Sequence, residues 1–146
     1  MTDDELLERY GLHPTGPALE HIRALLLSEA SESYRIGDGD NELMKLCCVQ
    51  LFHHGSLDDV LLIWHAKESN WDAHCYIDVQ LLCGAGVDAT KAFLAANPDS
   101  EARKALAYLV ECEEGGNFAR FSVARQSAFY HHYYQVPPEA GDDEDG

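Results

Sequence analysis

Apolar residues recur along most of the chain at spacings of three and four, which is the pattern of helices that bury one face. The stretch holding Leu19, Ile22, Leu26 and Ala30 shows this spacing clearly. Most such stretches follow a Ser, Thr, Asp or Asn and end at a Gly or Pro, which are the residues that begin and end helices. No stretch sustains the period-two alternation of a half-buried strand. The pattern therefore predicts an all-α fold.

The capping residues divide the chain into about eight short helices. Thr2 and Glu5 have the spacing of a capping box, and Gly11 is expected to end that first helix. The polar, glycine-containing stretch 31–40 is expected to be a loop. The predicted helices cover approximately residues 3–10, 17–30, 41–54, 57–64, 71–82, 89–96, 100–112 and 122–133. We expect one domain over residues 1–136 and a disordered acidic tail over residues 137–146.

A weak internal repeat with an offset of about thirty residues lies in the middle of the chain. Val49-Gln50-Leu51 returns as Val79-Gln80-Leu81. The segment Gln80–Ala89 resembles the stretch between ankyrin repeats, although the Thr-Pro-Leu-His signature of that family is absent, and HEAT-like hairpins are as similar. This resemblance covers roughly residues 41–120 and implies stacked antiparallel hairpins, an α-solenoid-like arrangement with an extended binding face. An irregular helical bundle is the alternative.

The net charge of −16 limits the classes of partner that the surface can bind. Five of the acidic residues and no basic residue lie in 137–146, which leaves −11 for the predicted domain. Such a surface repels nucleic acid and anionic membranes and attracts basic proteins. The alternative is that the acidity only keeps the protein soluble.

Cysteine usage and the first residues point to a reducing compartment. The five cysteines show no CxxC spacing, and most lie among apolar residues, where free thiols pack as small hydrophobes. The acidic start of the chain does not resemble a secretory signal, and no apolar run reaches the roughly 20 residues of a membrane span. We therefore expect a cytoplasmic protein.

No motif in the sequence predicts catalysis, a cofactor or a metal. The histidines, among them His53, His74 and His131, have neither HExxH nor zinc-finger spacing. Cys75 beside His74 lacks a third catalytic member and an oxyanion loop. The stretch 38–42 resembles the start of a calcium loop but lacks its later glycine and glutamate.

These exclusions favour a non-catalytic protein-interaction module, for instance an acidic immunity or antitoxin-like protein that neutralises a basic partner. The alternatives are a scaffold or regulatory domain that forms a homodimer through its aromatic C-terminal helix, and an enzyme or small-molecule binder with a pocket between helices. The candidate partner-binding residues are helix-start carboxylates and aromatic or histidine side chains: Asp58, Asp59, Trp64, Trp71, Asp72, Asp88, Tyr130, His132, Tyr133 and Tyr134.

Overall fold

The computed structural model of this chain describes residues 1–138 and contains eight α-helices, two short 3-10 helices and, over that range, no strand. This confirms the predicted all-α class. The elements are α1 (Asp3–Tyr10), α2 (Pro17–Ile36), α3 (Asn41–His54), η1 (Leu57–Asp59), α4 (Val60–Lys67), α5 (Trp71–Tyr76), η2 (Val79–Cys83), α6 (Val87–Ala96), α7 (Ser100–Glu114) and α8 (Val123–Tyr133). Most of the predicted tail, residues 139–146, lies outside the described residues.

Local capping explains most helix boundaries. The Thr2 hydroxyl accepts a hydrogen bond from the Glu5 amide at 3.2 Å, and the Glu5 carboxylate accepts one from the Thr2 amide at 3.1 Å, which confirms the predicted capping box. Gly55 ends α3 at a φ of 76°, a left-handed conformation that glycine adopts without steric cost. Asp99 caps α7 with its carboxylate.

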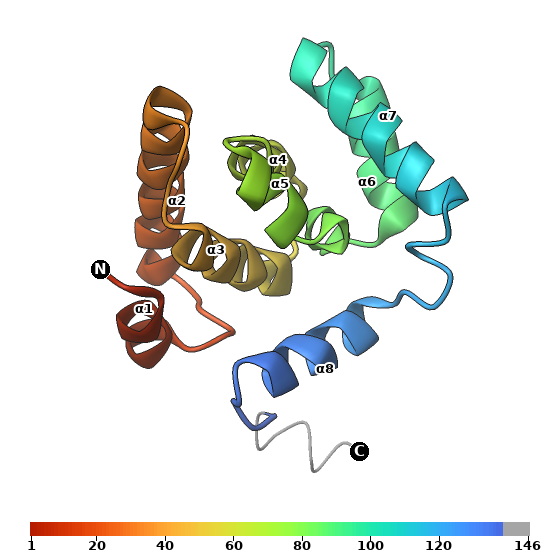
Figure 1. Ribbon diagram of the computed structural model, residues 1–146. Helices are drawn as coiled ribbons and strands as arrows, with labels where there is room; N and C mark the ends of the chain where they lie inside the picture. Colours follow the sequence, from red (N-terminus) through yellow and green to blue (C-terminus); the bar gives the residue numbers. More distant parts are fainter. Residues whose placement is uncertain (139–146) are drawn as a thin grey trace.

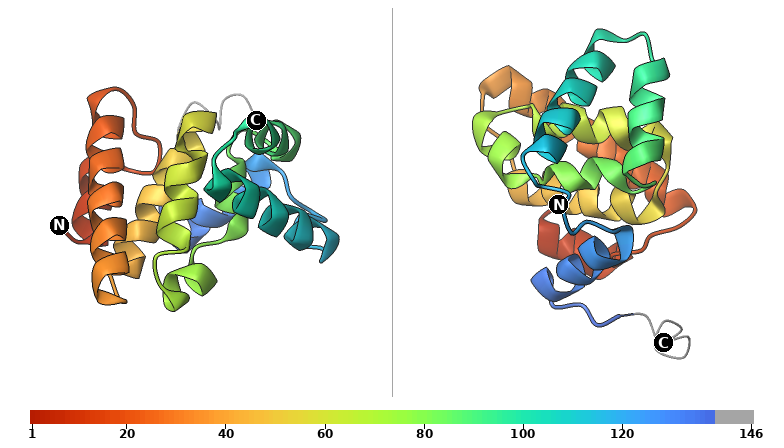
Figure 2. Two further views of the ribbon diagram at one scale, coloured as in Figure 1. Left: turned by 90° about the horizontal axis from the view of Figure 1, so that it is seen from above. Right: turned by 90° about the vertical axis from the view of Figure 1, so that its right-hand side faces the viewer.

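The helices form a succession of neighbouring groups (Figures 1 and 2). α1 and α2 lie at one end, the antiparallel pair α6 and α7 lies at the other, and α3, α4, α5 and η2 fill the space between them. α8 lies across the bottom of this arrangement in Figure 1, beneath α3. Among the described helices, none is both long and apolar enough to cross a membrane.

α3 is the centre of the core. Every residue from Leu43 to Phe52 is buried, because α1, α2, α5 and η2 all pack against this helix. Two of these buried side chains are polar and reach partners outside the helix. Gln50 donates to the Gly11 carbonyl at 2.8 Å, and Lys45 forms an ion pair with Asp78 at 3.6 Å. The Lys45 amine is paired in this way inside an otherwise apolar core, whereas the Gln50 side-chain oxygen is buried without a hydrogen-bond partner among the described residues.

The expected loop over residues 31–40 is wrong in its first part, because α2 continues to Ile36. The reason is a tertiary contact at Ser33, which is fully buried on the core side of the helix. The Ser33 hydroxyl donates to the Ser69 carbonyl at 3.3 Å and accepts from the Asn70 side-chain amide at 2.8 Å. Ser33 therefore continues the buried face of α2, while the other residues of 31–36 are exposed.

The expected single helix over residues 71–82 is also wrong. α5 ends at Tyr76, Ile77 is extended, and a 3-10 helix follows. Because Val49-Gln50-Leu51 lies in α3 whereas Val79-Gln80-Leu81 lies in η2, the two copies of the sequence repeat differ in structure.

Candidate functional site

α5 places two of the predicted partner-binding residues on the surface. Asn70 caps this helix by accepting a hydrogen bond from the Ala73 amide at 2.7 Å, which orients its first turn. Trp71 and Asp72 lie in that turn, and both are exposed. Trp71 leaves 75% of its surface accessible while its ring stacks against His74 at 5.7 Å. So large an exposed indole is unusual in a monomer and is typical of interface anchors.

α8 brings two further predicted residues beside α5. The Tyr133 hydroxyl shares a 2.7 Å hydrogen bond with the hydroxyl of Tyr76, and Tyr134 packs next to Tyr133. The buried Lys45 amine lies 4.3 Å from the centre of the Tyr76 ring and 4.7 Å from that of Tyr133. This internal cation–π contact fixes the two tyrosines on the core, so their outer faces form a stable surface.

Carboxylates surround these aromatic rings. Two adjoining surface hollows, of about 420 Å³ and 300 Å³, share Glu42 and Tyr76. The first also touches Asp72, and the second touches Asp3 and Asp4. None of the described residues that line either hollow is basic. We call this region the acidic–aromatic face, and it consists of Asp3, Asp4, Glu42, Asp72, Tyr76, Tyr133 and Tyr134. Trp71 precedes Asp72 in α5, but it lines neither hollow and stacks on His74 instead.

Three of the predicted partner-binding residues are buried and offer no surface to a partner. The Asp59 carboxylate is held by the Arg23 guanidinium at 2.7 and 3.0 Å. The Trp64 indole donates to Glu101 at 3.2 Å, and the Tyr130 hydroxyl donates to Asp78 at 2.5 Å. Burial and the neighbouring carboxylate of Asp78 raise the pKa of Tyr130 far above its usual value. These side chains join helices to one another.

The remaining predicted residues are exposed but lie elsewhere. Asp58 is in η1, Asp88 is in the first turn of α6, and His132 is on α8. None of these three lines the two hollows of the acidic–aromatic face. The helix-start carboxylates therefore do not form the single edge that a regular solenoid would give.

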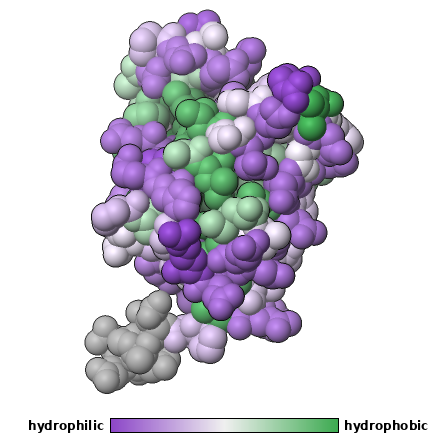
Figure 3. All heavy atoms as spheres, turned by 90° about the vertical axis from the view of Figure 1, so that its left-hand side faces the viewer, coloured by the Kyte–Doolittle hydropathy of each residue, from purple (hydrophilic) through white to green (hydrophobic). Residues whose placement is uncertain are grey.

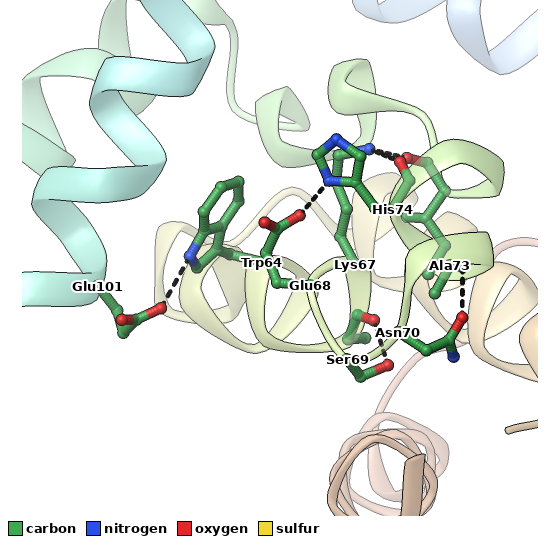
Figure 4. A network of polar contacts seen from close by, with 10 residues as sticks. Trp64, Lys67, Glu68, Ser69, Asn70, Ala73, His74 and Glu101 are labelled. Carbon is green, nitrogen blue, oxygen red and sulfur yellow. Dashed lines mark hydrogen bonds and ion pairs between the residues drawn. The ribbon is translucent and has the colours of Figure 1, made fainter. Parts of the chain in front are cut away.

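A polar network supports α5 from below (Figure 4). The Lys67 amine, on α4, donates to the main-chain carbonyls of His74 and, at 2.5 Å, Ile77. These carbonyls lie where α5 ends, so the buried amine takes the place of the hydrogen bonds that a longer helix would make. Burial lowers the pKa of Lys67. On the same side of α4, Glu68 bonds His74, and Trp64 reaches across to Glu101 on α7 (Figure 4).

Three histidines that are distant in sequence meet at another place. His13 lies between α1 and α2, His53 lies near the end of α3, and His131 lies on α8. One ring nitrogen of each lies within 4.8 Å of the others. Burial, together with the nearby rings of His13 and His131, lowers the pKa of His53 to about 4. Spacing along the chain could not reveal this cluster, since only the fold joins the three segments.

Sequence reasoning also missed the acidic members of the face. Asp3, Asp4 and Glu42 look like ordinary first-turn carboxylates, which complement the helix dipole. Only the packing of α1 beside α3 brings them to the tyrosines of α8.

No protein-family model, no curated protein and no solved structure matches this chain, so its function has to be argued from its own geometry.

Proposed function

We propose that this chain is a non-catalytic protein-interaction module whose acidic–aromatic face binds a basic segment of another protein. The observation that carries the proposal is the meeting of exposed Asp72 with Tyr76, Tyr133 and Tyr134 around two acidic hollows. The proposed partner is positively charged, and the stacked-hairpin, solenoid-like arrangement expected from the sequence remains part of the same proposal.

The chemistry of the face suits lysine and arginine side chains. Carboxylates pair with their charged ends, and tyrosine and tryptophan faces attract them by cation–π contact. The net charge of −16 adds a long-range field that speeds the approach of a basic protein. An immunity or antitoxin-like protein that covers the basic surface of a nuclease-like toxin would use these same features, with carboxylates in place of phosphates.

A matched pair of double variants tests the proposal. The first variant combines Glu42→Gln and Asp72→Asn, which lie on the face. The second combines Asp58→Asn and Asp88→Asn, which lie elsewhere. Each variant removes two negative charges from first helical turns. We expect immobilised wild-type protein to retain a basic protein from an extract of its host and to release it as salt is raised. The first variant should retain much less of it, and the second nearly as much as wild type.

Trp71 is exposed one residue before Asp72, so Trp71→Ala should also lower retention relative to wild type, because an exposed anchor of this size contributes about 2 kcal/mol or more to binding. Equal loss in the two double variants, or retention that salt does not change, would show that the face is not the binding surface.

A homodimer is the second candidate, and exposed apolar side chains favour it. Phe129 and Tyr133 on α8 stack at 6.2 Å, and each leaves more than two fifths of its surface accessible. α2 exposes Leu27 and Ile36, and Figure 3 shows an apolar band flanked by polar atoms on the α1–α2 side. Light scattering at increasing concentration decides this candidate: a dimer that Phe129→Ser dissociates supports it, and a monomer throughout rejects it.

A further inference from the structure

The cluster of His13, His53 and His131 has the donor set of a transition-metal site. We propose that these three imidazoles bind one Zn²⁺ ion, at a place separate from the acidic–aromatic face. Three imidazole nitrogens are a recurring zinc ligand set, in which water takes the fourth position. Among residues 1–138, no thiol or carboxylate belongs to the cluster, and imidazoles are poor ligands for calcium and magnesium, which prefer oxygen.

Main-chain carbonyls orient two of the rings for this role. A carbonyl oxygen can only accept, so the contact of the His53 Nδ1 with the Leu12 carbonyl at 2.7 Å places the proton on Nδ1. The same holds for the His131 Nδ1, which lies 2.9 Å from the Val136 carbonyl. The Nε2 atom of each ring therefore carries the lone pair that can bind a metal. Zinc-bound histidines characteristically donate their other N–H to a carbonyl in this way.

The contacts at these lone pairs are made by groups that can turn away. The Ser127 hydroxyl lies 2.9 Å from the His53 Nε2, and the His13 Nε2 lies 2.8 Å from the His131 Nε2. Tetrahedral zinc at its usual bond lengths holds its nitrogen ligands roughly 3.3 Å apart. The His13 ring stacks on the His53 ring with centroids 4.0 Å apart, so it has to turn out of this stack to direct a nitrogen at a shared ion. Its exposed position in the loop between α1 and α2 allows that rotation.

The surroundings also favour a cation at this place. His13 is exposed, His53 is half-buried and His131 is buried, so the cluster opens to solvent on the His13 side. An ion can reach the cluster from that side. The strongly negative protein as a whole raises the local concentration of divalent cations.

Cobalt replaces zinc as a visible probe, because tetrahedral Co²⁺ absorbs light in a way that aqueous Co²⁺ does not. We expect the full-length, reduced protein to bind one Co²⁺ saturably and Zn²⁺ to displace it. His13→Ala should weaken binding by at least about a hundredfold, since it removes a direct ligand. This variant is expected to fold, because His13 is exposed in a loop.

The matched control is His54→Ala with His132→Ala, which removes the exposed neighbours in sequence of two proposed ligands. Cys75→Ser removes the exposed thiol as a competing site. Both controls should keep wild-type affinity. No saturable tetrahedral Co²⁺ signal in the wild type, an unchanged affinity in His13→Ala, or an equal loss in the two-histidine control would overturn the proposal.

Discussion

Lys67 shows how one buried polar residue determines local backbone structure. Its amine bonds two carbonyls at the end of α5, where neither glycine nor proline stands to end the helix. The aliphatic part of the Lys67 side chain is buried, and its charged amine bonds main-chain carbonyls where most buried amines bond a carboxylate.

Lys67→Met should therefore destabilise the protein by about 2–4 kcal/mol, because two buried carbonyl oxygens lose their donor. Urea unfolding measures this free energy. Lys104→Met is the control, since Lys104 is exposed and its bond to Glu101 spans one turn of α7, where a loss of less than about 0.5 kcal/mol is expected. Similar losses in the two variants would contradict the role given to Lys67.

His53 gives the stability a defined dependence on pH. Its pKa falls from 6.5 to about 4 on folding, so the folded protein keeps the ring neutral where the unfolded chain protonates it. The stabilising contribution is complete above pH 6.5 and is lost as the pH falls towards about 4.

Unfolding with a chelator present, at several pH values in that range, tests this expectation. His53→Gln should flatten the decline of the unfolding free energy relative to wild type, whereas His54→Gln, at the exposed neighbouring position, should leave the slope unchanged. An identical slope in His53→Gln would exclude His53 as its source.

At the scale of elements, Asn70 joins three helices. It caps α5, donates to Ser33 on α2 at 2.8 Å, and donates to Asn41 on α3 at 2.9 Å. The contact with Ser33 holds the last turns of α2 against α5.

Asn70→Ala should cost about 2–3 kcal/mol, from a lost cap of about 1 kcal/mol together with two lost hydrogen bonds. Asp99→Ala removes a cap and no side-chain contact to another helix, so about 1 kcal/mol is expected there. Chemical unfolding of both variants gives the comparison. If the two losses are equal, Asn70 acts as a cap alone.

The helix ends that the sequence predicts correctly are those with local signals, such as Thr2 with Glu5, Gly55 and Asp99. The two errors lie where a partner on another helix decides. Ser33 continues α2 because Asn70 is opposite, and Lys67 ends α5 from another helix. The same holds for the site: Asp72 can be recognised from the sequence as a helix-start residue, but its acidic and tyrosine neighbours come from α1, α3 and α8.

At the scale of the whole molecule, the charge balance works against compactness. A net charge of −16 repels itself more strongly in the folded state than in the expanded chain. Raising sodium chloride from about 0.02 M to about 0.5 M should therefore raise the urea midpoint, because screening relieves this repulsion. A midpoint that falls instead would mean that the ion pairs outweigh the repulsion.

The acidic–aromatic face is assembled from segments at both ends of the chain and from its middle, with Asp3 and Asp4 at one extreme and Tyr133 and Tyr134 at the other. The face is therefore completed late in the synthesis of the chain. A chain emerging from the ribosome exposes α1 to α7 first, and these helices alone lack Tyr133 and Tyr134. The acidic–aromatic face is complete only after α8 has left the exit tunnel, so a nascent chain does not present the whole proposed surface before synthesis of the fold is finished.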